Sequence, residues 1–140
     1  MFELELENGI FFRVESDEFI PGAYHVRLQR DETVETLSNL HLVPLWDDLP
    51  QFEEGNFYQK TFTSYPAGQG WGRLLISTLI ENLEEAIPNC NTIYSSSWVN
   101  ENNLDETDYI TIDAVAFWDS LVRLNLAERN EEMARYRLLI

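Results

Sequence analysis

Hydrophobic and polar residues alternate along much of the N-terminal third of the chain. Between residues 2 and 14 the alternation continues on both sides of Asn8-Gly9, which predicts two strands joined by a two-residue turn. The same pattern returns over residues 24–29 and predicts a third strand. This part of the chain is therefore expected to be mostly antiparallel sheet.

The next segment has a different spacing. Asp31 is placed to cap a helix, and Val34, Leu37 and Leu40 follow at helical intervals until Pro44 breaks the pattern. We expect a short helix here, followed by an exposed acidic loop over residues 46–56.

Strand and helix patterns alternate in the second half of the chain. Strands are predicted over residues 57–65, 91–99 and 135–140. Helices are predicted from Gly70 until Pro88 closes the pattern, and over residues 113–127. Together the elements indicate one α+β (mixed α/β) domain over residues 1–140, with a mostly antiparallel central sheet and flanking helices.

A glycine-rich turn lies between the strand at 57–65 and the helix that follows it. Gly68, Gly70 and Gly72 allow backbone N–H groups to crowd together at a helix start, where the helix dipole favours negative charge. The turn lacks the Lys-Ser/Thr pair of a Walker loop and the full Rossmann spacing. It suits a phosphate or pyrophosphate; the alternative is a tight connection that binds nothing.

Length and composition narrow the class of protein. With 140 residues, of which 44% are hydrophobic, the chain can bury one core but is too short for two ordinary domains. No apolar run approaches the ~20 residues of a membrane span, and the acidic start is unlike a signal peptide, so we expect a cytoplasmic protein with no membrane partner. Cys90 is the only cysteine, so neither an internal disulfide nor a zinc site is expected.

The chain is strongly acidic. Its 25 Asp and Glu against 9 Lys and Arg give a net charge of −16, which disfavours direct binding to nucleic acid. Such a surface could attract a cationic small molecule, a basic protein tail or a DNA-binding protein, or could serve only solubility. The acidic pairs have no metal-binding spacing, and we assign no metal site. His25 and His41 have no Ser or Cys nucleophile motif beside them and receive no chemical role, with His25 expected to point outward.

Three segments in order resemble a known superfamily. They are Lys60-Thr61-Phe62, Ala67-Gly68-Gln69-Gly70-Trp71-Gly72 and Ala114-Val115-Ala116-Phe117-Trp118-Asp119-Ser120-Leu121. Over residues 57–140 this order is similar to the GNAT superfamily of acyl-CoA-dependent N-acyltransferases. The signature of that family, Arg/Gln-x-x-Gly-x-Gly/Ala, holds the coenzyme A pyrophosphate on backbone amides, and Gly70 and Gly72 match its two glycine positions.

The resemblance implies a GNAT-like fold and N-acyltransferase activity with acetyl-CoA or another acyl-CoA as cosubstrate. The strand through Phe62 would splay from its neighbour and receive the pantetheine arm between them, and the helix from 113 would flank the thioester. The cofactor-binding residues would be Phe62, Gly68, Gln69, Gly70, Trp71, Gly72 and Arg73.

The chain departs from the family pattern in several places. Ala67 stands where the family has Arg or Gln, so Arg73 would have to supply that phosphate contact. Thr111 replaces a frequent Asn, and Trp118 replaces the tyrosine that often protonates the leaving thiolate, although an indole N–H is not a useful acid. One short helix after Asp31 stands where the family carries two that shape the acceptor site.

Acyl transfer needs an unprotonated amine, a donor to the carbonyl oxygen and a proton for the thiolate. Backbone N–H groups of a bulged strand near Phe62 would serve the oxygen. Glu53 and Glu54, in the loop before this strand, are candidate bases, and Tyr94 and Tyr109 are candidate acids. The acceptor is expected to be an amine, favoured by the acidic surface if it is cationic, and a homodimer is left open.

Two other functions fit the same sequence. One is a non-catalytic interaction protein on a GNAT-like scaffold, in which the changes at Ala67 and Trp118 reflect lost chemistry. The other is an acidic inhibitor that imitates nucleic-acid charge and occupies a DNA-binding protein. Saturable binding of acetyl-CoA distinguishes the transferase from both.

Overall fold

The structure is a computed structural model that describes residues 1–30, 36–44, 55–64, 70–96, 112–132 and 134–140. The strands are β1 (Phe2–Glu5), β2 (Ile10–Ser16), β3 (Tyr24–Arg30), β4 (Thr36–Pro44), β5 (Asn56–Ser64), β6 (Thr92–Tyr94), β7 (Ala127–Asn130) and β8 (Arg135–Leu138). The α-helices in these ranges are α1 (Trp71–Glu81), α2 (Leu83–Ala86) and α3 (Ile112–Arg123).

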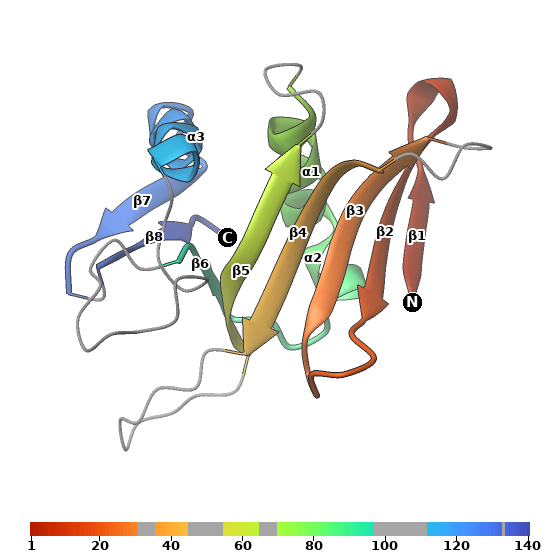
Figure 1. The fold of residues 1–140 in the computed structure, drawn as a ribbon, viewed down its shortest axis with the longest axis horizontal. Coiled ribbons are helices and arrows are strands. Elements are labelled where there is room, and N and C mark those ends of the chain that lie inside the picture. Colours follow the sequence, from red (N-terminus) through yellow and green to blue (C-terminus); the bar gives the residue numbers. More distant parts are fainter. Residues whose placement is uncertain (31–35, 45–54, 65–69, 97–111, 133) are drawn as a thin grey trace.

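The strands form a single 8-stranded sheet in the order β1-β2-β3-β4-β5-β6-β8-β7 (Figure 1). Neighbouring strands run antiparallel except β5 and β6, which are parallel and are joined by the crossover that contains α1 and α2. The chain therefore has an α+β fold with a mostly antiparallel sheet, as its sequence predicts.

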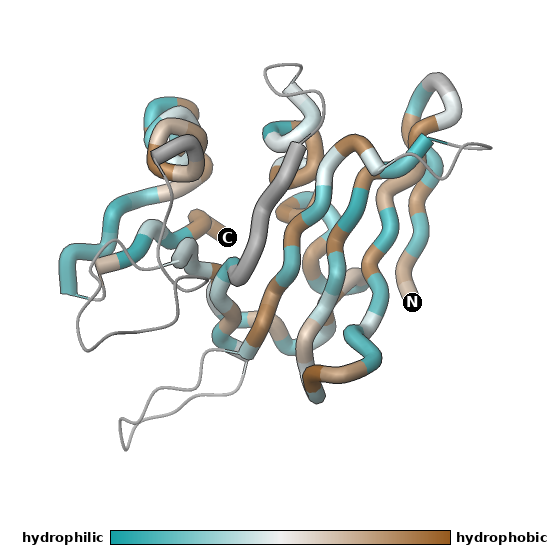
Figure 2. The backbone as a smooth tube through the Cα atoms, in the orientation of Figure 1, coloured by the Kyte–Doolittle hydropathy of each residue, from teal (hydrophilic) through white to brown (hydrophobic). Residues whose placement is uncertain are grey.

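The first three strands follow the predicted alternation, which Figure 2 shows as hydrophilic and hydrophobic positions in turn along the tube. β1 and β2 form the expected hairpin, but the predicted two-residue turn is wrong. A 3-10 turn over Glu7–Gly9 joins the strands, and Leu6 donates its amide to the carbonyl of Ile10. Gly9 takes a φ of +70°, which is typical of a three-residue hairpin loop.

The helix predicted after Asp31 is wrong where the structure describes it. Residues 31–35 lie outside the described ranges, and residues 36–44 form β4, which pairs with β3. The register between these strands shifts so that Leu37 is an extra residue in β4, a β-bulge. Leu37 and Leu40 are both buried although they are three residues apart. The bulge therefore gives a strand the apolar spacing of a helix.

α1 packs against β3, β4 and β5, and it lies behind these strands in Figure 1. Leu75, Ile76 and Leu79 are fully buried on the face that the sequence predicts. The helical pattern expected to reach Pro88 is divided, because α1 ends at Glu81 and the short α2 follows. No helix within the described ranges has the length and apolar character needed to cross a membrane.

The C-terminal elements match the predictions in part. β6 is shorter than the strand expected over residues 91–99, of which 97–99 lie outside the described ranges. α3 ends at Arg123, so the prediction of helix up to Ala127 is wrong. Asn125, with a φ of +61°, turns the chain, and Ala127 begins β7, a strand that the sequence analysis did not predict.

The sheet has two unlike faces. One face packs with side chains of α1 and α3 into a hydrophobic core that includes Phe12, Val26, Leu40 and Trp118. Because side chains alternate along a strand, the intervening residues of β2, β3 and β4 point to the opposite face. We call this the polar face; its polar residues are Arg13, Glu15, His25, Arg27, Gln29, Asn39 and His41, and Phe11 and Val43 lie on it as well.

Candidate functional site

The parallel strands β5 and β6 pair over a short stretch, which we call the fork. They pair over three positions, from Asn56 opposite Thr92 to Tyr58 opposite Tyr94. At the first of these positions the hydroxyl of Thr92 donates to Asn56 Oδ1 at 2.6 Å, and the carbonyl of Gly55 accepts the amide of Thr92 at 3.3 Å. These contacts fix one end of the paired stretch.

The described pairing of the two strands ends at Tyr94. The chain after β6 turns to β8, where Ser95 donates its amide to the carbonyl of Tyr136 and Ser95 Oγ accepts the amide of Tyr136, both at 2.9 Å. β5 continues to Ser64, and within the described residues its only strand partner there is β4. We call the β6-facing side of residues 60–64 the open edge of β5.

β5 contains a bulge where the open edge begins. The β4 partners of Gln59 and Thr61 are adjacent residues, so Lys60 is an extra residue in β5. A bulge interrupts the ladder and leaves the extra residue unpaired, which re-aims backbone groups locally. Phe62 is two residues further along. This is the bulged strand near Phe62 on which the sequence analysis places the thioester carbonyl.

α1 begins where the sequence predicts, directly after the glycine turn. Gly70 is its N-cap, with a φ of +82°, and a Cβ at this position would meet no atom within 4 Å. Leu74 donates its amide to the carbonyl of Gly70. No acceptor in the described part of the chain takes the amides of Trp71, Gly72 and Arg73. These three N–H groups form the positive end of the helix dipole, where a negative charge is favoured.

Two cationic side chains flank this first turn of α1. Arg73 is exposed, whereas Gly72 is buried against the core. Trp71 is half-buried, and the guanidinium of Arg30 lies 5.6 Å from the centroid of its ring. Arg73 is therefore an exposed cation on the first turn of α1.

Side-chain hydrogen bonds converge on Gln59, the residue after the last paired position of β5. Trp118 Nε1 donates to Gln59 Oε1 at 2.7 Å, and Ser96 Oγ donates to the carbonyl of Gln59 at 2.6 Å. Trp118 is 1% exposed and stacks on Tyr136. The indole of Trp118 is thus buried and hydrogen-bonded, and it links α3 to β5.

Two phenols lie near the fork. The hydroxyl of Tyr136 donates to Asp119 Oδ1 at 2.5 Å, and burial together with this hydrogen bond raises the pKa of Tyr136 to about 12. Such a phenol is a weak proton donor to a thiolate, because an ordinary thiol has a pKa of about 8.5. Tyr94, a candidate acid from the sequence, occupies the last paired position of β6 and is 8% exposed. Tyr94 therefore borders the fork.

The structure describes some of the predicted site residues and not others. The described ones form two groups, Tyr94 with Phe62 on the strands of the fork, and Gly70, Trp71, Gly72 and Arg73 at the start of α1. The predicted residues outside the described ranges are Glu53, Glu54, Tyr109, Gly68 and Gln69.

The structure brings together three residues to which the sequence analysis gave no role. Asp17 Oδ2 lies 2.7 Å from His25 Nε2 and 3.0 Å from His41 Nε2. The two histidines are cross-strand partners, and their rings stack with centroids 4.3 Å apart. Asp17 Oδ1 accepts the amides of Ile20 and Phe19, and these hydrogen bonds hold the pKa of the carboxyl well below its usual range. We call these three residues the His-Asp-His cluster.

The incorrect prediction of a helix after Asp31 is the reason that the sequence did not indicate this cluster. A helix removes His41 from the sheet, whereas β4 places it opposite His25 on the polar face. The alternation already put His25 outward, and Asp17 follows β2 at a turn, where Asp side chains commonly accept backbone amides. The available signal was therefore a turn Asp beside two outward histidines on neighbouring strands.

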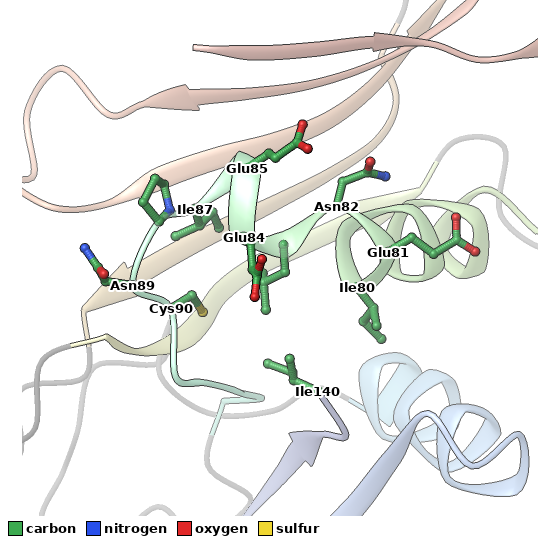
Figure 3. Close-up of a pocket in the computed structure, with 11 residues that line it drawn as sticks. Ile80, Glu81, Asn82, Glu84, Glu85, Ile87, Asn89, Cys90 and Ile140 are labelled. Carbon is green, nitrogen blue, oxygen red and sulfur yellow. The ribbon is translucent and has the colours of Figure 1, made fainter.

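A pocket of about 710 Å³ lies elsewhere, between the end of α1, α2 and the C-terminal residue (Figure 3). In Figure 3 the side chains of Glu84, Cys90 and Ile140 point toward its centre. Burial raises the pKa of the Cys90 thiol to about 12, so this group is not a thiolate nucleophile at neutral pH. None of the predicted site residues that the structure describes lines the pocket, and we do not assign the site to it. Its lining residues are Ile80, Glu81, Asn82, Leu83, Glu84, Glu85, Ile87, Pro88, Asn89, Cys90 and Ile140.

The candidate site therefore has three parts: the bulge of β5, its open edge and the first turn of α1. They follow one another along the chain, because the glycine turn leads from β5 into α1. Comparison with known proteins adds no family: no family model matches the sequence, and no curated protein matches it.

Proposed function

We propose that this chain is an N-acyltransferase that transfers an acyl group from acetyl-CoA or another acyl-CoA to an amine. The observation that carries the proposal is the bulged, open edge of β5, followed along the chain by a helix whose first amides have no described acceptor. In the GNAT superfamily, which the sequence resembles, splayed strands receive the pantetheine arm and a helix start holds the pyrophosphate.

The pyrophosphate would bind at the first turn of α1. A chain with a net charge of −16 repels anions over long range, so a diphosphate needs a local positive field. The amides of Trp71, Gly72 and Arg73 supply one through the helix dipole, and the guanidinium of Arg73 adds a full charge. Both contributions are strongest at the first turn of α1, where they would offset the repulsion of the acidic chain.

The thioester would lie along the open edge near the bulge at Lys60. Backbone N–H groups directed at the carbonyl oxygen stabilise the negative charge that develops on it as the amine attacks. A cationic amine would be drawn to the acidic surface, which raises its encounter rate.

The test of the coenzyme site is an isosteric pair of variants at the N-cap. Asn and Asp both tolerate the left-handed conformation that Gly70 adopts, so Gly70→Asn and Gly70→Asp share the backbone cost and differ in charge. We expect Gly70→Asp to bind acetyl-CoA about tenfold more weakly than Gly70→Asn, because one charge near the diphosphate costs on the order of 1.4 kcal/mol. Isothermal titration calorimetry with acetyl-CoA measures the difference.

The wild-type chain provides the reference for this pair. Acetyl-CoA at a hundredfold excess over its Kd should stabilise the folded chain by about 2.7 kcal/mol, seen as a rise in melting temperature. Equal affinities of the two variants, each comparable to wild type, would overturn the proposed cradle. A wild-type chain whose melting temperature is indifferent to acetyl-CoA and to longer acyl-CoAs would overturn the function itself.

One observation favours a second function, a non-catalytic binding protein on the same scaffold. Trp118 occupies the place of the family's proton donor and is committed to Gln59 and Tyr136. Acetyl-CoA binding without any transfer to primary amines would favour this alternative, and transfer would exclude it.

A further inference from the structure

The His-Asp-His cluster lies on the polar face, one strand away from the bulge of β5. His41 is the β4 partner of Thr61, the residue that follows the extra residue Lys60. The side chains are 7% exposed for Asp17, 12% for His41 and 25% for His25. The cluster is thus largely shielded from water and adjoins the strand on which the thioester carbonyl is proposed to lie.

The geometry of the cluster suits proton transfer better than metal binding. The planes of the two rings are 7° from parallel, with centroids 4.3 Å apart. An imidazole binds zinc along a lone pair in its own ring plane at about 2.0–2.1 Å, so one ion cannot satisfy two stacked rings. A metal-bound histidine usually donates from its second nitrogen, whereas His25 Nδ1 is buried and has no hydrogen-bond partner among the described residues.

The charges around His41 come from several elements. Asp17 is the carboxylate in contact with its ring, at 3.0 Å. Glu15 and Arg27 lie 3.6 Å apart and offset each other. Among the described residues, the titratable or charged ones of the surrounding elements are Asp17 in the turn, Arg13 and Glu15 on β2, His25 and Arg27 on β3, and Lys60 on β5. An imidazolium formed at His41 is therefore balanced first by Asp17.

We propose that His41 is the base that takes a proton from the acceptor amine, with Asp17 and His25 as positioning residues. This inference rests on the proposed transferase function. The acceptor arrives as an ammonium ion, and neutral His41 accepts one of its protons directly or through a water molecule. Asp17 holds the ring in place and balances its new charge.

The remaining atoms of the reaction then balance. The lone pair of the amine forms the C–N bond at the thioester carbonyl carbon, and the C–S bond breaks. The nitrogen loses its second proton to the departing thiolate, and His41 returns its proton to solvent. The ammonium ion and the acyl-CoA thus give an amide, the coenzyme A thiol and one proton, with no oxidant or metal required.

The test compares His41→Gln with the wild-type chain, using acetyl-CoA and spermidine as probes. We expect transfer to fall about 100-fold at pH 7 and the acidic limb of the pH profile of kcat/KM to disappear, while acetyl-CoA affinity is unchanged. Asp17→Asn, a second variant, should lower kcat about tenfold with KM for acetyl-CoA unchanged. Glu15→Gln, on the same face, is the control and should transfer at the wild-type rate.

The outcomes separate this inference from the function on which it rests. A wild-type chain that does not bind acetyl-CoA overturns the transferase. A His41→Gln chain that binds acetyl-CoA and keeps the wild-type rate and pH profile overturns only the role of His41. If spermidine is not acetylated, the NMR signal of the His41 imidazole is the test. Saturation of the chain with acetyl-CoA should shift this signal, and an unshifted signal would overturn the role of His41 as the base. Zn²⁺ binding that His41→Gln abolishes would also overturn it.

Discussion

The two halves of the sheet are held together in different ways. From β1 to β5, each strand pairs with the next strand of the chain, and β4 and β5 alone share seven registered positions. From β5 to β7 the ladder is short: β6 meets β5 at three positions and β8 at one. In this part, side-chain hydrogen bonds between residues far apart in the sequence add to the few backbone pairs, including those from Trp118 and Ser96 to Gln59.

This difference has a consequence for binding. A continuous ladder uses the backbone groups on both sides of each inner strand, so it leaves none for a ligand. Beyond its pairing with β6, one edge of β5 has no strand partner in the described residues. Side-chain hydrogen bonds from Ser96 and Trp118 link the C-terminal elements to β5 at Gln59. Within the described residues, the strands from β1 to β5 thus form a continuous ladder, whereas β5 has one edge without a strand partner beyond the pairing with β6.

The largest expected effect comes from disturbing the continuous half of the sheet, by which we mean strands β1 to β5. Leu40 is 1% exposed and lies between Val26 of β3 and Phe62 of β5 in the register. Leu40→Ala should lower the free energy of unfolding by about 2–5 kcal/mol, measured by urea denaturation, because it leaves a cavity in the core. Thr36→Ala, at an exposed position of the same strand, is the control and should change it by less than about 0.5 kcal/mol. Equal effects would contradict the described register of β4.

The two halves also differ in how much of them the sequence predicts. Hairpin strands have local alternation, so β1, β2 and β3 were predicted from pattern alone. β4 was not, because the bulge at Leu37 breaks its alternation and imitates helical spacing. α1 was predicted through its apolar stripe and the glycines before it, whereas β7 has only four residues and follows a turn at Asn125.

The candidate site was predictable only where it depends on local sequence. The start of α1 follows from its glycines, and a bulge near Phe62 followed from the family resemblance. The contact between Gln59 and Trp118 joins residues 59 positions apart, and the meeting of Asp17 with His41 requires the register of two strand pairs. Neither spacing leaves a periodic pattern, so both depend on tertiary structure.

A smaller effect is expected at the fork. Trp118→Phe removes the donor to Gln59 Oε1 and leaves a buried acceptor unsatisfied, which should lower the free energy of unfolding by about 1–3 kcal/mol. Gln59→Leu in the same background removes that acceptor and should recover part of the loss. A double-mutant cycle by urea denaturation measures the coupling. Strictly additive effects would show that this hydrogen bond does not hold the fork.

The smallest effect concerns acid stability in the continuous half, where Asp17 joins the turn after β2 to β3 and β4. The amides of Ile20 and Phe19 and the hydrogen bond with His25 lower the pKa of Asp17, so the unfolded chain binds a proton there at a higher pH than the folded chain does. The stabilisation is therefore complete above the unfolded pKa of about 3.9 and declines as pH falls below it.

Asp17→Asn should be less stable than wild type at pH 5, and the difference should shrink toward pH 2. Urea midpoints at pH 5, 3 and 2 measure this, with Glu18→Gln at the neighbouring exposed carboxyl as control. A difference that stays constant with pH would mean that the ionised carboxylate does not stabilise the turn, leaving the continuous half dependent on its apolar face alone.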